Sequence, residues 1–236
     1  MAGVLKLEQA CKKLKSNNFT ERRDGRTPEL VVLHYTAMKD CAAAARVLCD
    51  PEREVSAHYL IGRDGEVLNL VPEEMRAWHA GKGAWRGSGD VNSRSIGIEL
   101  DNDGLSPFSE PLMRALETLL GSRLLAAWGI GPEGVIGHSD MAPGRKIDPG
   151  RRFDWQRLAR QGLAVWSDAR GGAVDAAQFR ANAMAFGYPD VEDALLLEVV
   201  RMRFRPWARG PLDGDDCAVM ADLAARYGLD RTACAP

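Results

Sequence analysis

Between Gly137 and Gly150 the sequence GHSDMAPGRKIDPG brings together three side chains that could do chemistry: His138, Lys146 and Asp148. Two Pro-Gly turn signals fix where this segment bends, so its side chains can be aimed. Lys146 and Asp148 stand two residues apart, which places them on one side of an extended chain. A neutral imidazole and a carboxylate are good zinc ligands, and a nearby ammonium could neutralise an oxyanion at such a metal.

A catalytic zinc site combines three protein ligands with an open position for water, so a third ligand is needed. His34 is well placed, because it lies at the end of the apolar run 29–36, which is typical of a buried strand. The water needs a base, and Glu99 is the candidate, since it shares a face of the alternating segment 95–101 with Gly97. Taken singly, a histidine satisfied in the core and a glutamate on a solvated strand face are the commoner explanations. The residue types therefore give a hydrolase hypothesis without showing that these residues meet.

The elements that must position these residues follow an α/β order. Short β-branched runs predict strands, and leucines at three- and four-residue spacing predict helices. The expected elements are a strand at 29–36, a helix at 38–49, a hairpin at 55–71, a strand at 95–101, a helix at 109–128, a short apolar segment at 134–137 and a helix at 154–165. This order predicts an α/β fold with a mixed central β-sheet flanked by helices.

A glycine-rich segment at 73–89 carries Trp78, His79 and Trp85. Aromatic residues in such a loop make a poor core element and a plausible binding wall, because loops held on a rigid scaffold tend to carry function. Tryptophans that simply cover the domain explain the pattern equally well. The sequence leaves both explanations open.

The pattern of residue types along the sequence changes after Trp166. Residues 167–172 are polar and end in two glycines, which is typical of a linker. Three helical patterns follow, at 174–186, 191–203 and 215–227, with no strand pattern among them. We therefore expect an α/β domain at 1–166, a linker at 167–172 and a small three-helix domain at 173–236.

Composition excludes several classes of protein. The 236 residues carry a formal net charge of −2, which gives no general electrostatic reason to bind nucleic acid. No apolar run approaches the roughly 20 residues of a membrane-spanning helix. The cysteines are odd in number and form no Cys-x-x-Cys pair, which argues against a disulfide framework and mildly for a reducing compartment. They are Cys11, Cys41, Cys49, Cys217 and Cys234.

Six motifs lie in order along residues 28–166: LHYT at 33–36, SAHYLIGRDG at 56–65, AWHAG at 77–81, SIGIEL at 95–100, GHSD at 137–140 and GRKIDPG at 144–150. Together they closely resemble the type 2 N-acetylmuramoyl-L-alanine amidase family, which shares its fold with the peptidoglycan recognition proteins. Six motifs in the right order are far more specific than any single pattern.

The resemblance implies a zinc ion held by His34, His138 and Asp148, with Glu99 as general base and Lys146 stabilising the oxyanion. It implies cleavage of the amide between the lactyl group of N-acetylmuramic acid and the L-alanine of the stem peptide. The expected substrate is peptidoglycan or its fragments, muropeptides that include 1,6-anhydro forms.

The resemblance also bears on substrate contacts. His79 matches a family position near the substrate, and Trp78 and Tyr35 are further candidate contacts. His58 matches a motif that is largely structural. Residues 195–207 and 212–227 resemble the helical peptidoglycan-binding domain found after some of these amidases, although a helical appendage that only packs on the catalytic domain fits the same residues.

Two alternatives remain at this stage. A non-catalytic peptidoglycan receptor shares the fold, but such receptors typically lack a zinc ligand, whereas all three ligands are present here. An envelope amidase acting on intact wall is the second. No secretion signal is visible and the cysteines are unpaired, which favours the cytoplasm; the wall-binding-like tail favours the periplasm or cell envelope. The sequence does not indicate an oligomeric state.

Overall fold

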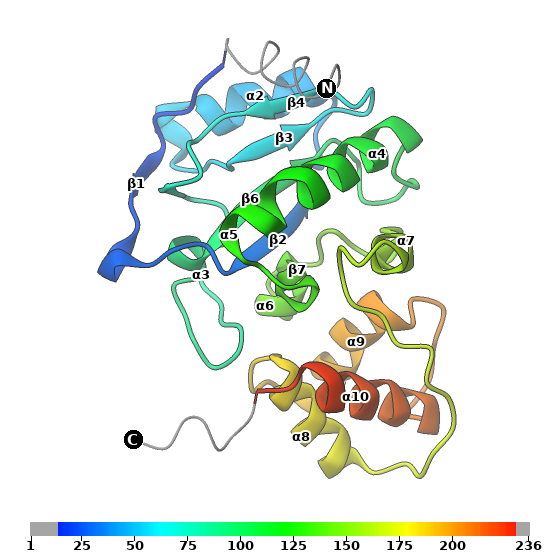
Figure 1. Cartoon of the computed structure of the whole chain (residues 1–236). Coiled ribbons are helices and arrows are strands. Elements are labelled where there is room, and N and C mark those ends of the chain that lie inside the picture. The colour runs from blue at the N-terminus through cyan, green and yellow to red at the C-terminus, as the bar shows by residue number, and fades with distance from the viewer. Residues whose placement is uncertain (1–13, 230–236) are drawn as a thin grey trace.

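A mixed β-sheet forms the centre of the protein, which the computed structural model describes over residues 14–229 (Figure 1). The strands lie in the order β4-β3-β6-β2-β7. Within this five-stranded sheet β3 and β4 run antiparallel, whereas β3, β6, β2 and β7 pair in parallel. The strands are β2 (Leu30–Tyr35), β3 (Tyr59–Ile61), β4 (Val67–Asn69), β6 (Ser95–Leu100) and β7 (Val135–Gly137). The expected mixed α/β fold is confirmed.

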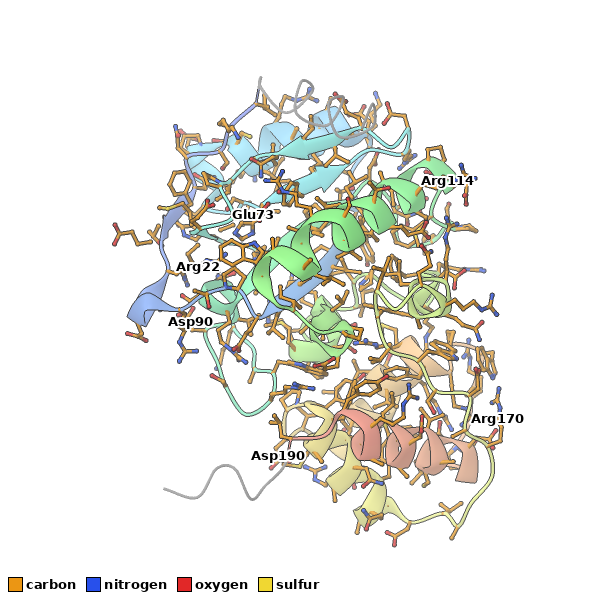
Figure 2. The ribbon with its side chains drawn as sticks, in the orientation of Figure 1. Arg22, Glu73, Asp90, Arg114, Arg170 and Asp190 are labelled. Atoms are coloured by element: carbon orange, nitrogen blue, oxygen red, sulfur yellow. The ribbon has the colours of Figure 1, made fainter. Side chains whose placement is uncertain are left out.

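A second, two-stranded sheet pairs β1 (Phe19–Glu21) with β5 (Met75–Ala77), so the expected glycine-rich loop at 73–89 contains a strand. Arg22 follows β1 and donates hydrogen bonds to the carbonyl oxygens of Ser93 and Ser95 at 3.1 Å each. Figure 2 shows this arginine beside the sheet, above Asp90. The N-terminal strand is thereby tied to the start of β6.

One face of the sheet is covered by helices that lie in front of it in Figure 1. They are α4 (Glu110–Leu119), the π-helical turn η3 (Leu120–Leu124), α5 (Leu125–Trp128) and α7 (Trp155–Arg160). Leu33 and Ile98 of the sheet share one buried cluster with Leu116 of α4. Glu73, labelled in Figure 2, accepts a hydrogen bond from the indole of Trp128 at 2.6 Å and fastens α5 to the loop before β5.

The other face is covered in two separate places. Helix α2 (Cys41–Cys49) packs over β3, where Leu48 and Leu60 share a cluster. The C-terminal helices pack over β2 and β7, where Val32 and Ile136 share a cluster with Phe186 and Val200. These helices are α8 (Ala176–Phe186), α9 (Asp193–Phe204) and α10 (Gly214–Tyr227). The sheet surface between the two coverings carries the polar residues described below.

Aspartates set where several helices begin. The side chain of Asp40 accepts a hydrogen bond from the N–H of Ala43, and Asp175 and Asp213 do the same for α8 and α10. The helix expected from residue 38 therefore begins at Cys41. The remaining short elements are α3 (Val91–Arg94), α6 (His138–Met141) and the 3₁₀ turns Arg23–Gly25, Pro51–Arg53 and Pro132–Gly134.

The described part of the chain contains no helix that is both long and apolar enough to cross a membrane. Its three cysteines, Cys41, Cys49 and Cys217, are unpaired. Cys11 and Cys234 lie outside the described residues.

Candidate metal centre

Three adjacent parallel strands bring the candidate residues to one edge of the sheet. His34 of β2 and Glu99 of β6 are register partners, so their side chains leave the same face side by side. His138 directly follows β7, the other neighbour of β2. Asp148 lies in the loop after α6. This loop is fixed against the start of α6, because the N–H of Ser139 donates to the Asp148 carbonyl oxygen at 2.9 Å. Residues more than a hundred positions apart thus converge.

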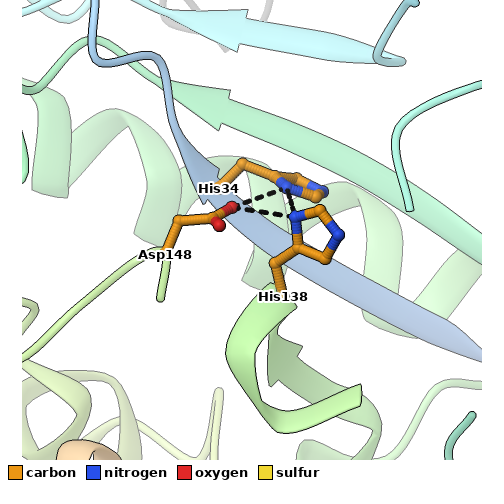
Figure 3. A group of neighbouring side chains, drawn as sticks. All are labelled: His34, His138 and Asp148. Carbon is orange, nitrogen blue, oxygen red and sulfur yellow. Dashed lines mark hydrogen bonds and ion pairs between the residues drawn. The ribbon is translucent and has the colours of Figure 1, made fainter. Parts of the chain in front are cut away.

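His34, His138 and Asp148 present one ligand atom each to a common point (Figure 3). The Nδ1 atoms of the two histidines are 2.9 Å apart. Asp148 Oδ2 lies 2.9 Å from the first and 3.0 Å from the second. Ligand atoms around a tetrahedral zinc, at about 2.0–2.1 Å from the ion, stand roughly 3.3 Å apart. The three atoms therefore need only a small outward shift to hold such an ion, and all three residues are buried.

The hydrogen-bond partner of Nε2 in each imidazole determines whether Nδ1 carries a proton or a lone pair. His138 Nε2 lies 2.8 Å from the carbonyl oxygen of Ala80, which can only accept, so the proton sits on Nε2. His138 Nδ1 then directs a lone pair at the common point. Burial, with His138 beside it, lowers the pKa of His34 to about 4, so the His34 ring is neutral at pH 7. Two nitrogen lone pairs and a carboxylate that face each other repel, and a cation between them would remove this repulsion. Two imidazoles and a carboxylate are a donor set that fits zinc.

His79 stands directly behind His34. His34 Nε2 is 3.1 Å from His79 Nδ1, and His79 Nε2 is 3.2 Å from the hydroxyl oxygen of Ser95. That hydroxyl donates to the carbonyl oxygen of Val91 at 2.6 Å, so Ser95 accepts from His79, and His79 accepts from His34. The His79 ring lies so close to Gly97 that a Cβ there would stand 2.4 Å from it. This series of hydrogen bonds leaves His34 Nδ1 free for a metal.

Glu99 has a carboxylate oxygen, Oε2, that is buried without a hydrogen-bond partner among the described residues. Burial raises the pKa of Glu99 to about 8, and the negative charge of Asp148 acts in the same direction. The ammonium of Lys146 opposes both. Burial would likewise raise the pKa of Asp148, but the two imidazoles beside its carboxylate hold that pKa well below its usual range. Asp148 is thus a carboxylate, whereas Glu99 is poised to gain and lose a proton.

A cavity of about 520 Å³ surrounds these groups, and it is lined by the eight residues expected to be metal ligands, catalytic groups or substrate contacts. They are His34, Tyr35, Trp78, His79, Glu99, His138, Lys146 and Asp148. Lys146 is exposed at the mouth, on the same loop as Asp148. Trp78 and His79 also line a neighbouring cavity of about 500 Å³, and Tyr35 lines another of about 320 Å³. The arrangement provides room for an extended substrate on either side of the metal-ligand group.

Two features of the site could not be anticipated from residue types. Asn92 accepts hydrogen bonds from the backbone N–H groups of His79 and Ala80, and so fixes the segment that touches both candidate ligand histidines. Arg145 donates to the Ala80 carbonyl oxygen at 2.6 Å. Arg145 lies inside the motif at 144–150 and Asn92 shortly before the motif at 95–100, but neither residue type indicates these contacts.

Two aromatic residues named in the sequence analysis, Trp85 as a possible binding wall and His58 as a structural residue, lie outside this cavity. Trp85 is fully buried and packs edge-on against Phe186 and Tyr188, so it covers the domain and does not form a binding wall. His58 is also fully buried: its Nδ1 accepts from the N–H of Gly97, and its Nε2 lies 3.0 Å from the Met75 carbonyl oxygen. Both are structural residues.

A His-His-Asp group at the carboxyl ends of parallel strands, with an unpartnered carboxylate beside it, fits the site of a metal-dependent hydrolase. The sequence model described as N-acetylmuramoyl-L-alanine amidase matches residues 24–151. The chain belongs to this family.

Individual relatives agree. The chain is 36% identical to N-acetylmuramoyl-L-alanine amidase AmiD of Escherichia coli K12, over 86% of this chain and 84% of the relative. It is 32% identical to 1,6-anhydro-N-acetylmuramyl-L-alanine amidase AmpD of the same organism, over 63% of this chain and 90% of the relative.

Two solved structures are also similar. One is E. coli AmiD in complex with the substrate anhydro-N-acetylmuramic acid-L-Ala-D-γ-Glu-L-Lys (TM-score 0.78, 34% identity, 86% of this chain and 91% of that one). The other is AmpDh3 of Pseudomonas aeruginosa with anhydromuramic pentapeptide (TM-score 0.76, 32% identity, 92% of this chain and 100% of that one).

Proposed function

We propose that this protein is a zinc-dependent N-acetylmuramoyl-L-alanine amidase that acts on muropeptides. The observation that carries the proposal is the convergence of His34, His138 and Asp148 within hydrogen-bond distance of one another, each offering a lone pair. Glu99 supplies a base and Lys146 a positive charge in the same cavity. Every group that hydrolysis of an amide needs from the protein is therefore present in one place.

Zinc held by the three ligands supplies a Lewis acid that lowers the pKa of water and polarises a carbonyl oxygen. Glu99 accepts the proton of the attacking water, for which its unpartnered Oε2 is available. The water oxygen then attacks the carbonyl carbon of the lactyl amide. Lys146 stabilises the negative charge that develops on the carbonyl oxygen. Glu99 returns its proton to the L-alanine nitrogen, and the amine leaves.

The form of the substrate is part of the proposal. Two similar structures contain anhydro-muropeptides, and the name of AmpD specifies a 1,6-anhydro substrate. We therefore expect this protein to cleave 1,6-anhydro-muropeptide fragments. Comparing the turnover of such fragments with that of intact sacculi tests this preference; faster release of peptide from sacculi would contradict it.

The reaction itself is tested with purified protein and an anhydro-muropeptide. We expect one zinc ion per chain, loss of peptide release on chelation, and recovery when zinc is added back. Mass spectrometry of the products must show a free N-terminal L-alanine on the released peptide. Zinc-independent binding without any cleavage would identify a receptor, and a cut inside the peptide would identify a different amidase.

The division of the chain also stays a proposal: an amidase unit at 1–166, a connection at 167–172 and a helical unit at 173–236. A wall-binding role of the helical unit predicts that the full-length protein sediments with purified sacculi. We further propose a cytoplasmic location, supported by the unpaired thiols of Cys41, Cys49 and Cys217. Detection of the protein in an osmotic-shock fraction of its cells would place it in the periplasm instead.

A further inference from the structure

Asp140 is a buried carboxylate that the proposed reaction does not use. It lies in α6, two residues after the candidate ligand His138, and its side chain is 1% exposed. Its Oδ2 accepts a hydrogen bond of 2.7 Å from the N–H of Gly137, the residue just before His138. Asp140 therefore shapes the turn by which the chain leaves β7 and presents the histidine.

The partners of Asp140 come from the C-terminal helical region. Arg203 of α9, with a side chain 2% exposed, donates to Asp140 Oδ2 at 2.6 Å. The hydroxyl of Tyr188, in the connection between α8 and α9, donates to Asp140 Oδ1 at 2.8 Å. A buried carboxylate is stable only when it is paired and hydrogen-bonded, so both contacts are needed where they are.

Arg203 also holds the other side of the same turn. Its second terminal nitrogen donates to the carbonyl oxygen of Val135, the first residue of β7, at 3.0 Å. The guanidinium stacks over the ring of Trp155 at 4.2 Å, which fixes its plane. One side chain from α9 thus contacts the chain three residues before His138 and two residues after it.

The loop that carries Asp148 rests on the same helix. Gly144 has a φ of +74°, and a Cβ there would stand 3.0 Å from Leu195 of α9. Arg151, just beyond the loop, donates to the carbonyl oxygen of Pro206 at 3.3 Å. Both candidate ligands that follow β7 are therefore supported from the C-terminal side of the chain.

We propose that Arg203, together with Tyr188, is a positioning residue for the metal ligand His138, so that the C-terminal helices are a structural part of the metal centre. The inference rests on the proposed zinc site. Loss of Arg203 leaves Asp140 as an unpaired buried charge, and the turn must then move to bring it to water. The Nδ1 of His138 moves with the turn, away from the point that it shares with His34 and Asp148.

Substitution of Arg203 by methionine tests this, with zinc affinity as the readout. The dissociation constant of the full-length protein for Zn²⁺ is measured at fixed pH by competition with a chromophoric chelator. Removal of groups that orient metal ligands typically weakens binding by about 10- to 100-fold. We expect about a tenfold loss for Arg203→Met. Co²⁺ substitution provides a second readout, since a displaced ligand alters the visible absorption bands of the metal.

Arg201→Met is the matched control. Arg201 lies on the same helix, has a side chain 5% exposed and pairs with the fully buried Asp216, but this pair lies entirely within the helical region. Both substitutions break a buried ion pair and lower the unfolding temperature. Only Arg203→Met should change the zinc dissociation constant and the cobalt spectrum. Tyr188→Phe removes a single hydroxyl, preserves the packing, and should weaken zinc binding to a smaller degree.

The outcomes separate two failures. If the wild-type protein binds no zinc, the proposed function is wrong. If the wild-type protein binds zinc and Arg203→Met and Tyr188→Phe bind it equally well, the positioning role is wrong. Equal weakening in Arg203→Met and Arg201→Met would also overturn it, because the effect would then follow general stability.

Discussion

Glu99→Gln is the substitution that separates the proposed base from the metal ligands. Glutamine keeps the shape of the side chain but accepts no proton, so we expect kcat to fall by about 10²- to 10⁴-fold, the usual range for general acid–base catalysis. Zinc content should remain that of the wild-type protein, because Glu99 is not among the three converging ligands. Peptide release is followed by liquid chromatography, and zinc by elemental analysis of the same samples.

The same substitution has a calculable effect on the metal-free protein. Burial raises the pKa of Glu99 from 4.5 to about 8. Between these two pH values the carboxyl group is therefore ionised in the unfolded chain but mostly protonated in the folded protein. Stability from this group is present below pH 4.5 and is lost as the pH rises towards 8. At pH 7 the loss is on the order of 3 kcal/mol, at about 1.36 kcal/mol per pKa unit. Glutamine cannot ionise, so the variant escapes this loss.

Urea unfolding of both chelated proteins between pH 5 and pH 8 measures the difference. The stability of Glu99→Gln relative to wild type should rise steadily with pH. Glu73→Gln is the control with the opposite sign: burial would raise the pKa of Glu73, but hydrogen bonds from Tyr59, Trp128 and Arg123 lower it. That variant should lose stability at neutral pH and retain turnover. A relative stability of Glu99→Gln that does not change with pH, or near-full activity, would refute the assignment.

Two further substitutions test the surroundings of the site. Lys146→Met should lower kcat and move the acidic limb of the pH–rate profile to higher pH, because the ammonium lowers the pKa of Glu99; an unmoved limb would place Lys146 outside the reach of the base. Ser95→Ala removes the hydroxyl that accepts from His79, and should weaken zinc binding by about tenfold as the orientation of His34 is lost. Chelator competition measures this affinity, and an unchanged value would show that His79 needs no such support.

Patterns along the chain predicted the strands and helices that carry chemistry. The apolar run ending at His34 and the alternation around Glu99 define β2 and β6, and the leucine spacing defines α4. These predictions succeed because burial on one face leaves a period in the sequence. Strands β1 and β5 escaped notice, since each has only three residues and so is too short to leave such a period.

Contacts between distant residues are less visible in a sequence. The resemblance to a family named the three ligands, but nothing in the spacing of Asp140, Tyr188 and Arg203 indicates that they meet. The burial of Trp85 could not be predicted from the sequence either. A tryptophan among glycines is typical of a loop, yet Trp85 is fully buried against the C-terminal helical region. Tertiary packing determines the burial and the partners of such residues, and the amino-acid composition of a segment contains no information about that packing.

The hydrophobic cluster that joins the sheet to α8, α9 and α10 imposes an order on synthesis. The ribosome completes β2 and β7 well before α8, α9 and α10. Until these helices are made, Val32 and Ile136 lack many of the side chains that bury them in the folded protein. A chain that stops at residue 151, where the family match ends, presents this apolar sheet face to neighbouring chains. A gene fragment cut at that boundary should therefore yield aggregates, whereas the full chain covers this sheet face once α8, α9 and α10 have been made.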